Sequence, residues 1–369
     1  MPLLTSALSF LAISQLLFLG IVLLVQYRQQ VLAQLIVLFS LCMSGYLLLV
    51  TTLFDGNVFA VQVLSLLAVS TPAVLWVLAM LLFVDNSRLA RPGLLLIAVY
   101  IPAHVVGNLL VALGHDSSLL TVTSFLFPQL AMLSLSVHAI YLGIAGRDND
   151  LIEERRIVRV PFVISMGIFV AVVLVLSVDT GQNIAAQTPT TEAFVQYRRL
   201  FLATYALGVA LTLNMAFFGL KPGAAALLSN ASEAGRRQGR LAKPVSKQDL
   251  KLLQRLKKAM EEDRLFMQEG LTITALARII SAPEYKLRRL INKQLQFRNF
   301  NQYINSHRIR EAGRLLAETE EPIANIALAT GFSALSSFNQ VFKETHGVPP
   351  RDYRLMHRGL QAPAPATSR

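Results

Sequence analysis

The chain has 369 residues, 54% of them apolar, and carries a formal net charge of +12. This apolar fraction exceeds that of an ordinary soluble domain, and the excess lies before Lys221. The first 220 residues contain no lysine, nine arginines and nine acidic residues, whereas the remaining 149 carry 25 basic and 13 acidic residues. A single cysteine, Cys42, excludes a disulfide framework within the chain and a metal site built from cysteines. The split predicts a membrane-embedded module joined to a basic module on one side of the bilayer.

Seven apolar stretches in the first 220 residues reach the roughly 20 residues that a helix needs to cross a bilayer. Short polar breaks separate most of them, which favours an up-and-down helical bundle. Their length and continuous apolarity exclude barrel strands. The first stretch has no charged segment before it and no convincing cleavage site, so we expect it to be retained. The predicted spans are Leu3–Val25, Val31–Phe54, Val58–Val84, Leu94–Leu113, Leu119–Ala145, Ile157–Val178 and Leu200–Leu220.

Arginine is concentrated in alternate loops between these predicted spans. The first, third and fifth loops contain arginine, whereas the second and fourth contain none. The sixth has Arg198 and Arg199 at the edge of the last span, and the segment after that span is strongly basic. The positive-inside rule therefore predicts an outside N-terminus and a cytoplasmic C-terminal half. The loop arginines are Arg28, Arg88, Arg91, Arg147, Arg155, Arg156 and Arg159.

Two pairs of polar residues lie inside predicted spans and are the candidates for a ligand site. His104 and Asn108 are four residues apart and share a helix face, as do Ser134 and His138. Uncharged polar groups in membrane bundles also hydrogen-bond helices together, and the sequence leaves both interpretations open. The lysine-free bundle excludes a retinal Schiff base, and the placement of every acidic residue in a loop or at a span edge disfavours a proton-coupled transporter. No cofactor or metal is expected.

A linker and a basic helical domain are expected after the last span. Residues 221–246 are rich in Ala, Gly, Ser and Arg, and we expect them to be flexible. From Lys247 the apolar spacing is helical, and a first amphipathic helix is expected to end near Glu269. The Ala-Pro tail is expected to be disordered. The predicted boundaries are 1–220 for the membrane domain, 221–246 for the linker, 247–358 for the basic domain and 359–369 for the tail.

A helix-turn-helix pattern begins shortly after residue 270. Thr272 or Thr274 is expected to cap a short helix, which ends at a tight break over residues 281–283. The next helix, Glu284 to Leu295, has apolar residues on one face and basic residues on the other. Two short helices around a turn, the second basic on its outer face, predict a helix-turn-helix.

The same pattern recurs after a long helix expected over residues 299–318. Helices are expected from Pro322 to Thr330 and from Leu335 to Thr345, with a turn between them. Pro322 suits the first turn of a helix, and Gly331 suits the left-handed position that follows one. The basic domain is therefore predicted to contain two helix-turn-helix units and the chain to be all-α.

This basic domain resembles the DNA-binding domain of the AraC/XylS family of bacterial transcription regulators. The second unit carries most of the signature, IANIALATGFSALSSFNQVFKETHGVPPRDYR at 323–354. LRRLIN at 287–292 and RNFNQYINSHRIREA at 298–312 also match, so the resemblance covers roughly the last 110 residues. The apolar half resembles a less common membrane-spanning subgroup by architecture alone. The resemblance implies a transcription regulator of the bacterial inner membrane, an activator rather than an enzyme.

The resemblance places DNA contacts on the outer faces of two helices, where Arg can read guanine and Asn or Gln can read adenine. The implied base contacts are Tyr285, Arg288 and Arg289 in the first unit and Ser336, Asn339 and Gln340 in the second. Further DNA contacts are expected from Lys286, Asn292, Lys293 and Lys343. The family often has arginine in place of Gln340 and glycine in place of Ser281 and Gln296. A left-handed backbone at those two positions costs about 1 kcal/mol each.

The expected partners are double-stranded promoter DNA, the lipid bilayer and RNA polymerase. Homodimerisation and a small-molecule or lipid signal remain open, as does whether the bundle senses a signal or only tethers the domain. The alternative function is a transmembrane receptor or transporter whose basic tail binds RNA or lipid. That alternative is disfavoured because such a tail needs only charge, not two spaced helix-turn-helix units.

Overall fold

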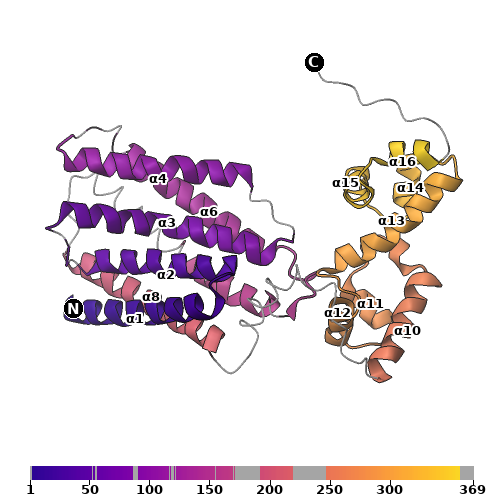
Figure 1. The fold of residues 1–369 in the computed structure, drawn as a ribbon, viewed down its shortest axis with the longest axis horizontal. Helices are drawn as coiled ribbons and strands as arrows, with labels where there is room; N and C mark the ends of the chain where they lie inside the picture. Colours follow the sequence, from indigo (N-terminus) through magenta and orange to yellow (C-terminus); the bar gives the residue numbers. More distant parts are fainter. Residues whose placement is uncertain are drawn as a thin grey trace, which may run out of the picture. The chain divides into compact units, whose positions relative to one another are not determined.

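The structure is a computed structural model, and it describes residues 2–51, 53–54, 56–85, 90–115, 117, 120, 122–153, 155–168, 170, 192–218 and 247–357. Every named element in these ranges is a helix (Figure 1). The chain divides into two compact units. Unit 1 is Met1–Arg147 with Glu154–Gly239, and unit 2 is Asp148–Glu153 with Arg240–Arg369. Six residues from a predicted loop of the membrane domain therefore belong to the basic unit.

Unit 1 is a bundle of long apolar helices (Figure 1). α2 packs between α1 and α3, α8 packs on α1, and α6 packs on α3. Large apolar side chains on the outer faces are exposed, including those of Phe59, Tyr141 and Met215. Residues 155–168 are also helical. The helices are α1 Pro2–Tyr27, α2 Val31–Val50, α3 Val58–Phe83, α4 Arg91–Ala112, the π-helix η1 Val122–Leu126, α6 Phe127–Ile144 and α8 Glu192–Phe218.

Five helices of the described residues are long and apolar enough to cross a membrane, where the sequence predicts seven. The predicted sixth span, Ile157–Val178, continues beyond residue 170 and so lies partly outside the described residues. The predicted seventh, Leu200–Leu220, coincides with α8 as far as Phe218 and ends outside the described residues, and α8 is not among the five. Its first turns contain Glu192, Arg198 and Arg199, and its residues from Leu200 to Phe218 are uncharged. The predicted linker and tail lie outside the described residues.

A buried arginine closes the ends of α3 and α6. Arg159 Nη1 donates to the carbonyls of Leu142, Gly143 and Ala145 at 2.9, 3.0 and 2.9 Å, and Nη2 donates to Phe83 O at 3.4 Å. Terminal helix carbonyls lack hydrogen-bond donors inside the helix and carry partial negative charge. A guanidinium supplies both the donors and the opposite charge. One turn earlier, Arg155 pairs with Asp85 at 2.9 Å. These two arginines, predicted from the sequence only as a topology signal, hold three helix ends together.

Unit 2 has two apolar clusters joined by one long helix. The first cluster includes residues of α10, α11, α12 and the start of α13, and the second includes later residues of α13 with α14 and α15. Helix α10 ends at Glu261, earlier than the predicted Glu269, and a 3₁₀ turn then places Phe266 in the core. The elements are α10 Lys247–Glu261, η3 Leu265–Met267, α11 Ile273–Ile279, α12 Glu284–Lys293, α13 Phe300–Glu318, α14 Ile323–Ala329, α15 Leu335–His346 and α16 Pro350–His357.

The caps and turns of unit 2 follow from local chemistry. Thr272, not Thr274, is the N-cap of α11, and its side chain accepts from Ala275 N at 3.1 Å. Ser281 and Gln296 have φ of 52° and 65°, so the left-handed backbone considered for these positions is present. Gly331 follows α14 with φ of 92°, as predicted. At that glycine an added Cβ would lie 2.6 Å from Met267 O and 2.9 Å from Met267 C.

We predict that Gly331→Ala destabilises unit 2 by about 3 kcal/mol or more, because left-handed strain adds to a clash with backbone that cannot rotate away. Gly347→Ala is the matched control: its φ is 78° but no atom lies within 4 Å of an added Cβ. The control should cost only about 1 kcal/mol. Hydrogen exchange of unit 2 peptides in the full-length protein measures both. An equal loss of exchange protection in the two variants would contradict the close approach of Gly331 to Met267.

Candidate nucleic-acid interface

The helix α12 presents a polar face to solvent because its apolar residues are buried in the core. Leu287, Leu290 and Ile291 are buried at helical spacing. On the opposite side Tyr285 is 63% exposed and the Arg289 side chain is 61% exposed. Arg289 contacts Asp249 at 3.5 Å, and an exposed pair of this kind contributes little stability, so a phosphate or base can displace it.

Lys293 is exposed on the last turn of α12, and two other predicted contacts on that helix are only half-exposed. Lys286 is half-buried. Asn292 is also half-buried, and its Nδ2 donates to Phe297 O at 2.9 Å. That bond spans the left-handed turn at Gln296, so Asn292 closes the end of the helix. Sequence spacing alone placed these residues on the outer face.

Arg288 does not lie where the sequence predicts it. Its side chain is buried, with 4% of the residue exposed, rather than directed outward. Its Nε and Nη2 contact Glu284 Oε1 at 2.8 and 2.7 Å, and its Nη1 donates to the carbonyl of Asp150 at 2.8 Å. A buried charge is tolerated when it is paired and hydrogen-bonded, and Glu284 one turn earlier provides the opposite charge. The outward orientation predicted for Arg288 is therefore wrong.

The helix α15 has the same division of faces as α12. Phe338 and Phe342 are fully buried in the second cluster. The remaining face offers hydroxyl, amide and ammonium groups, and the Gln340 amide donates to Glu344 at 3.0 Å. These groups can donate to and accept from base edges, and the lysine can contact a phosphate. The predicted contacts on this face are all exposed: Ser336, Asn339, Gln340 and Lys343.

An arginine of α13 holds the two helix pairs in one unit. Arg308 Nε donates to Phe266 O at 2.7 Å, and Nη2 donates to Gln268 O at 2.9 Å. Its guanidinium also lies over the Phe332 ring, 5.5 Å from the centroid. Burial lowers the pKa of Arg308, and Glu269 acts against that shift. The side chain thus links the turn before the first pair to the turn of the second.

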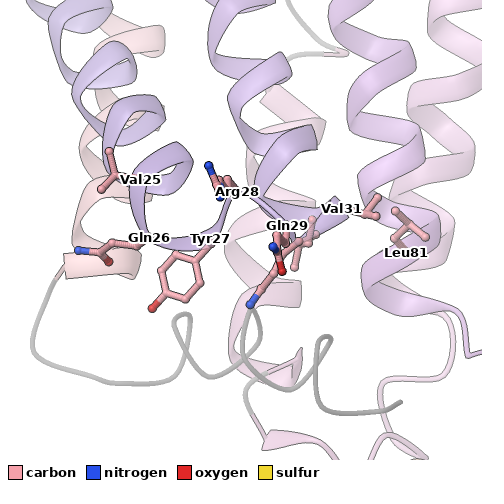
Figure 2. A pocket seen from close by; sticks show the side chains of 9 residues that line it. Val25, Gln26, Tyr27, Arg28, Gln29, Val31 and Leu81 are labelled. Atoms are coloured by element: carbon pink, nitrogen blue, oxygen red, sulfur yellow. The ribbon is translucent and has the colours of Figure 1, made fainter. Parts of the chain in front are cut away.

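The residues that line cavities in unit 1 define a second candidate site. A cavity of about 230 Å³ is lined mainly by apolar groups, with His104, Gln129 and Tyr205 among the polar ones. Asn108 does not line it. A larger open pocket of about 620 Å³ lies at the α1–α2 turn, where Figure 2 shows Tyr27 and Arg28. Consecutive residues of one turn form most of that pocket, whereas residues of α2, α3, α4, α6 and α8 line the smaller cavity, so the smaller cavity is the better candidate for a small ligand.

His104 joins three elements of unit 1 through hydrogen bonds. Its Nδ1 lies 2.8 Å from Ser124 O, and its Nε2 lies 2.8 Å from Ser65 Oγ and 2.9 Å from Asn108 Nδ2. Pro128 has no N–H to offer the carbonyl four residues earlier, which is that of Ser124. All three contacts are satisfied when Nδ1 carries the proton and Nε2 accepts. This arrangement supports the interhelical hydrogen-bond interpretation that the sequence left open.

The second predicted pair, Ser134 and His138, is not brought together. Ser134 is exposed, whereas His138 Nδ1 accepts a hydrogen bond from Trp76 Nε1 at 2.8 Å. Trp76 is fully buried. Sequence spacing cannot indicate this bond, because the two residues are 62 positions apart.

Comparison with known proteins links unit 2 to regulators. Residues 276–356 match a family model described as a helix-turn-helix domain. The regulatory protein PocR of Salmonella typhimurium is 32% identical over 27% of this chain and 33% of PocR. The probable transcription factor PqrA of Proteus vulgaris is 29% identical over 25% of this chain and 75% of PqrA. The TCP pilus virulence regulatory protein of Vibrio cholerae is 37% identical over 20% of this chain and 27% of that protein.

The matches cover only part of most of these proteins. The chain spans about a third of the length of PocR and 37% of the probable transcriptional regulator LumQ of Photobacterium leiognathi. Among solved structures, the C-terminal domain of AraT, a response regulator from Geobacillus stearothermophilus, is 26% identical with a TM-score of 0.26. That comparison covers 34% of this chain and 95% of the AraT domain.

We predict that His104→Ala lowers the midpoint of thermal unfolding of unit 1 by about 5 °C or more, because it leaves buried polar groups without partners. Fluorescence of Trp76, the single tryptophan, reports on this unit in the detergent-purified protein. Ser134→Ala removes an exposed hydroxyl and should change the midpoint by no more than about 1–2 °C. A His104→Ala protein as stable as this control would refute the linking role.

Proposed function

Because residues 276–356 form an AraC-type helix-turn-helix domain, we propose that this protein is a membrane-embedded transcription regulator. It binds promoter DNA sequence-specifically through two helix-turn-helix units, α11–α12 and α14–α15. The observation that carries the proposal is that the second helix of each pair buries its apolar residues and exposes hydrogen-bonding side chains. Two such helices on one unit suit two successive major grooves.

The exposed side chains differ between the two units and predict different readout. Arg289 of α12 suits a bidentate contact to guanine, while Asn339 and Gln340 of α15 suit adenine. Lys293 and Lys343 suit phosphates, which position the protein without specifying sequence. The buried Arg288 is not among the proposed base contacts.

The membrane location is supported by the five long apolar helices and by the exposed apolar side chains on them. The alternate-loop arginines support an outside N-terminus and a cytoplasmic unit 2, where DNA is available. A receptor or transporter with a merely basic tail accounts for the charge but not for two helix pairs with matched faces.

The role proposed for the bundle is to sense a signal, and the cavity of about 230 Å³ beside His104 is the proposed site. Its lining of apolar groups with a few polar ones suits a small, mainly apolar molecule. Dimerisation of the bundles would raise the effective concentration of a second unit 2 at a repeated site. RNA polymerase is the protein partner that activation requires.

We predict that Arg289→Ala, tested in full-length protein in nanodiscs, weakens binding to a selected DNA site by about 1–3 kcal/mol. It should also reduce the base preference at one position of that site. Lys293→Ala should weaken all sequences about equally and reduce the salt slope by roughly one. Gln340→Ala should affect a position about 10 base pairs away. Randomised-site selection and titration at two salt concentrations measure all three effects. A protein that prefers no sequence would contradict the proposal.

We predict that alkaline phosphatase fused after Ser246 is inactive and that a fluorescent protein fused there is bright, because this point lies in the cytoplasm. Phosphatase fused after Gly114, in the arginine-free fourth loop, should be active and is the matched control. Phosphatase activity after Ser246 would place unit 2 away from DNA.

A further inference from the structure

Residues 148–153 leave unit 1 after α6 and become part of the core of unit 2. Asp150 and Asn299 form an antiparallel bridge. Leu151 N donates to Arg298 O at 3.0 Å, and Phe300 N donates to Asn149 O at 2.7 Å. The Leu151 side chain is 3% exposed and belongs to the first apolar cluster. The segment is therefore bound by backbone pairing and by a buried anchor.

The same segment reaches the proposed recognition helix α12 through a chain of polar contacts. Thr274 Oγ1 donates to Glu284 Oε2 at 2.8 Å, and Glu284 Oε1 accepts from Arg288. Arg288 Nη1 then donates to the carbonyl of Asp150 at 2.8 Å. The Asp150 side chain accepts from Ile152 N at 3.0 Å, which fixes the turn. α11, α12 and the segment thus share one polar network, which is buried at Arg288 and Asp150 and exposed at Thr274.

We propose that residues 148–153 are a coupling strap, which docks on the first helix pair and lets unit 1 set the position of α12. Arg288 is in this view a positioning residue that joins the strap to the recognition helix. The consequence for DNA binding rests on the proposed function, but the mechanical coupling does not.

The chain segments that join the strap to the helices on either side of it are short. α6 ends at Ile144, so three residues separate it from the strap and reach at most about 11 Å. On the other side the helix over 155–168 follows almost at once. Both flanking helices are fixed in unit 1 by Arg155 and Arg159. In contrast, 28 residues separate Phe218 at the end of α8 from Lys247 at the start of α10. A shift of α6 against the following helix therefore reaches unit 2 first through the strap.

Docking is tested by hydrogen exchange on the full-length protein in nanodiscs. Leu151→Ala removes the buried anchor and should raise exchange of amides in 284–300 about tenfold or more. Ile152→Ala, in the same segment but outside the apolar cluster, should change it by less than about threefold. Leu151→Met should restore protection close to the native level. Unchanged exchange in Leu151→Ala would overturn the docking.

Coupling is tested by mutating an arginine of unit 1 and measuring hydrogen exchange of the α12 amides. Arg159→Ala loosens the ends of α3 and α6, and Arg155→Ala is the milder alternative if that variant fails to fold. With the native connection, either substitution should raise hydrogen exchange of the amides in 284–293 about threefold or more. When four residues, Gly-Ser-Gly-Ser, are inserted after Gly146, the same substitution should have little effect on that exchange. That insertion adds slack while leaving the docked contacts in place.

Equal effects with and without the insertion, or no effect on α12 in either, would overturn the coupling. A protein that couples in this way but prefers no DNA sequence would refute the proposed function and leave the strap intact. A protein with normal DNA selectivity but no coupling would refute the strap and leave the proposed function intact.

Discussion

Backbone carbonyls in apolar surroundings must find donors inside the protein, and in the described part of unit 1 Arg159 and His104 are such donors. Arg159 satisfies four carbonyls at the ends of α3 and α6. His104 serves the Ser124 carbonyl that Pro128 leaves without its helical donor. The first contact fixes where the chain leaves the bundle, and so fixes the start of the strap. The second ties α3, α4 and η1 around the cavity.

The same requirement explains the arrangement of unit 2. A guanidinium that is 4% exposed must have its donors paired, and Arg288 finds Glu284 within its own helix and Asp150 in the strap. Arg289, about 100° further round α12, remains free to face solvent. Adjacent arginines thus have opposite roles, one inside the protein and one on the surface that we propose binds DNA.

Local features were predictable from the sequence because their causes are local. Helix spacing, a threonine cap at Thr272 or Thr274 and the left-handed turn at Gly331 depend on residues within a few positions, whereas a left-handed backbone at Ser281 and Gln296 was considered only because of the family resemblance. The strap was not predictable, because Arg288 and its Asp150 partner are 138 residues apart and no periodicity signals such a contact. Leu151 and Ile152, two apolar residues in a loop rich in charged residues, were the available clue.

The site shows the same division. Apolar periodicity correctly predicted the buried face of α12 and so the exposure of Tyr285 and Arg289, whereas the exposure of Asn339 on α15 was expected from the family resemblance. It failed for Arg288, whose burial depends on a segment from elsewhere in the chain. Helical spacing also suggested that Ser134 and His138 act together, whereas the histidine instead bonds Trp76 on α3.

We propose that one chain holds a sequence-specific DNA-binding unit at a membrane. Chromatin immunoprecipitation of the full-length protein from the washed membrane fraction of cross-linked cells tests this directly. We expect enrichment of a few discrete promoter sites that share one motif, and loss of that motif preference in Arg289→Ala. Recovery of the protein in the soluble fraction, or of DNA from all sequences alike, would contradict it.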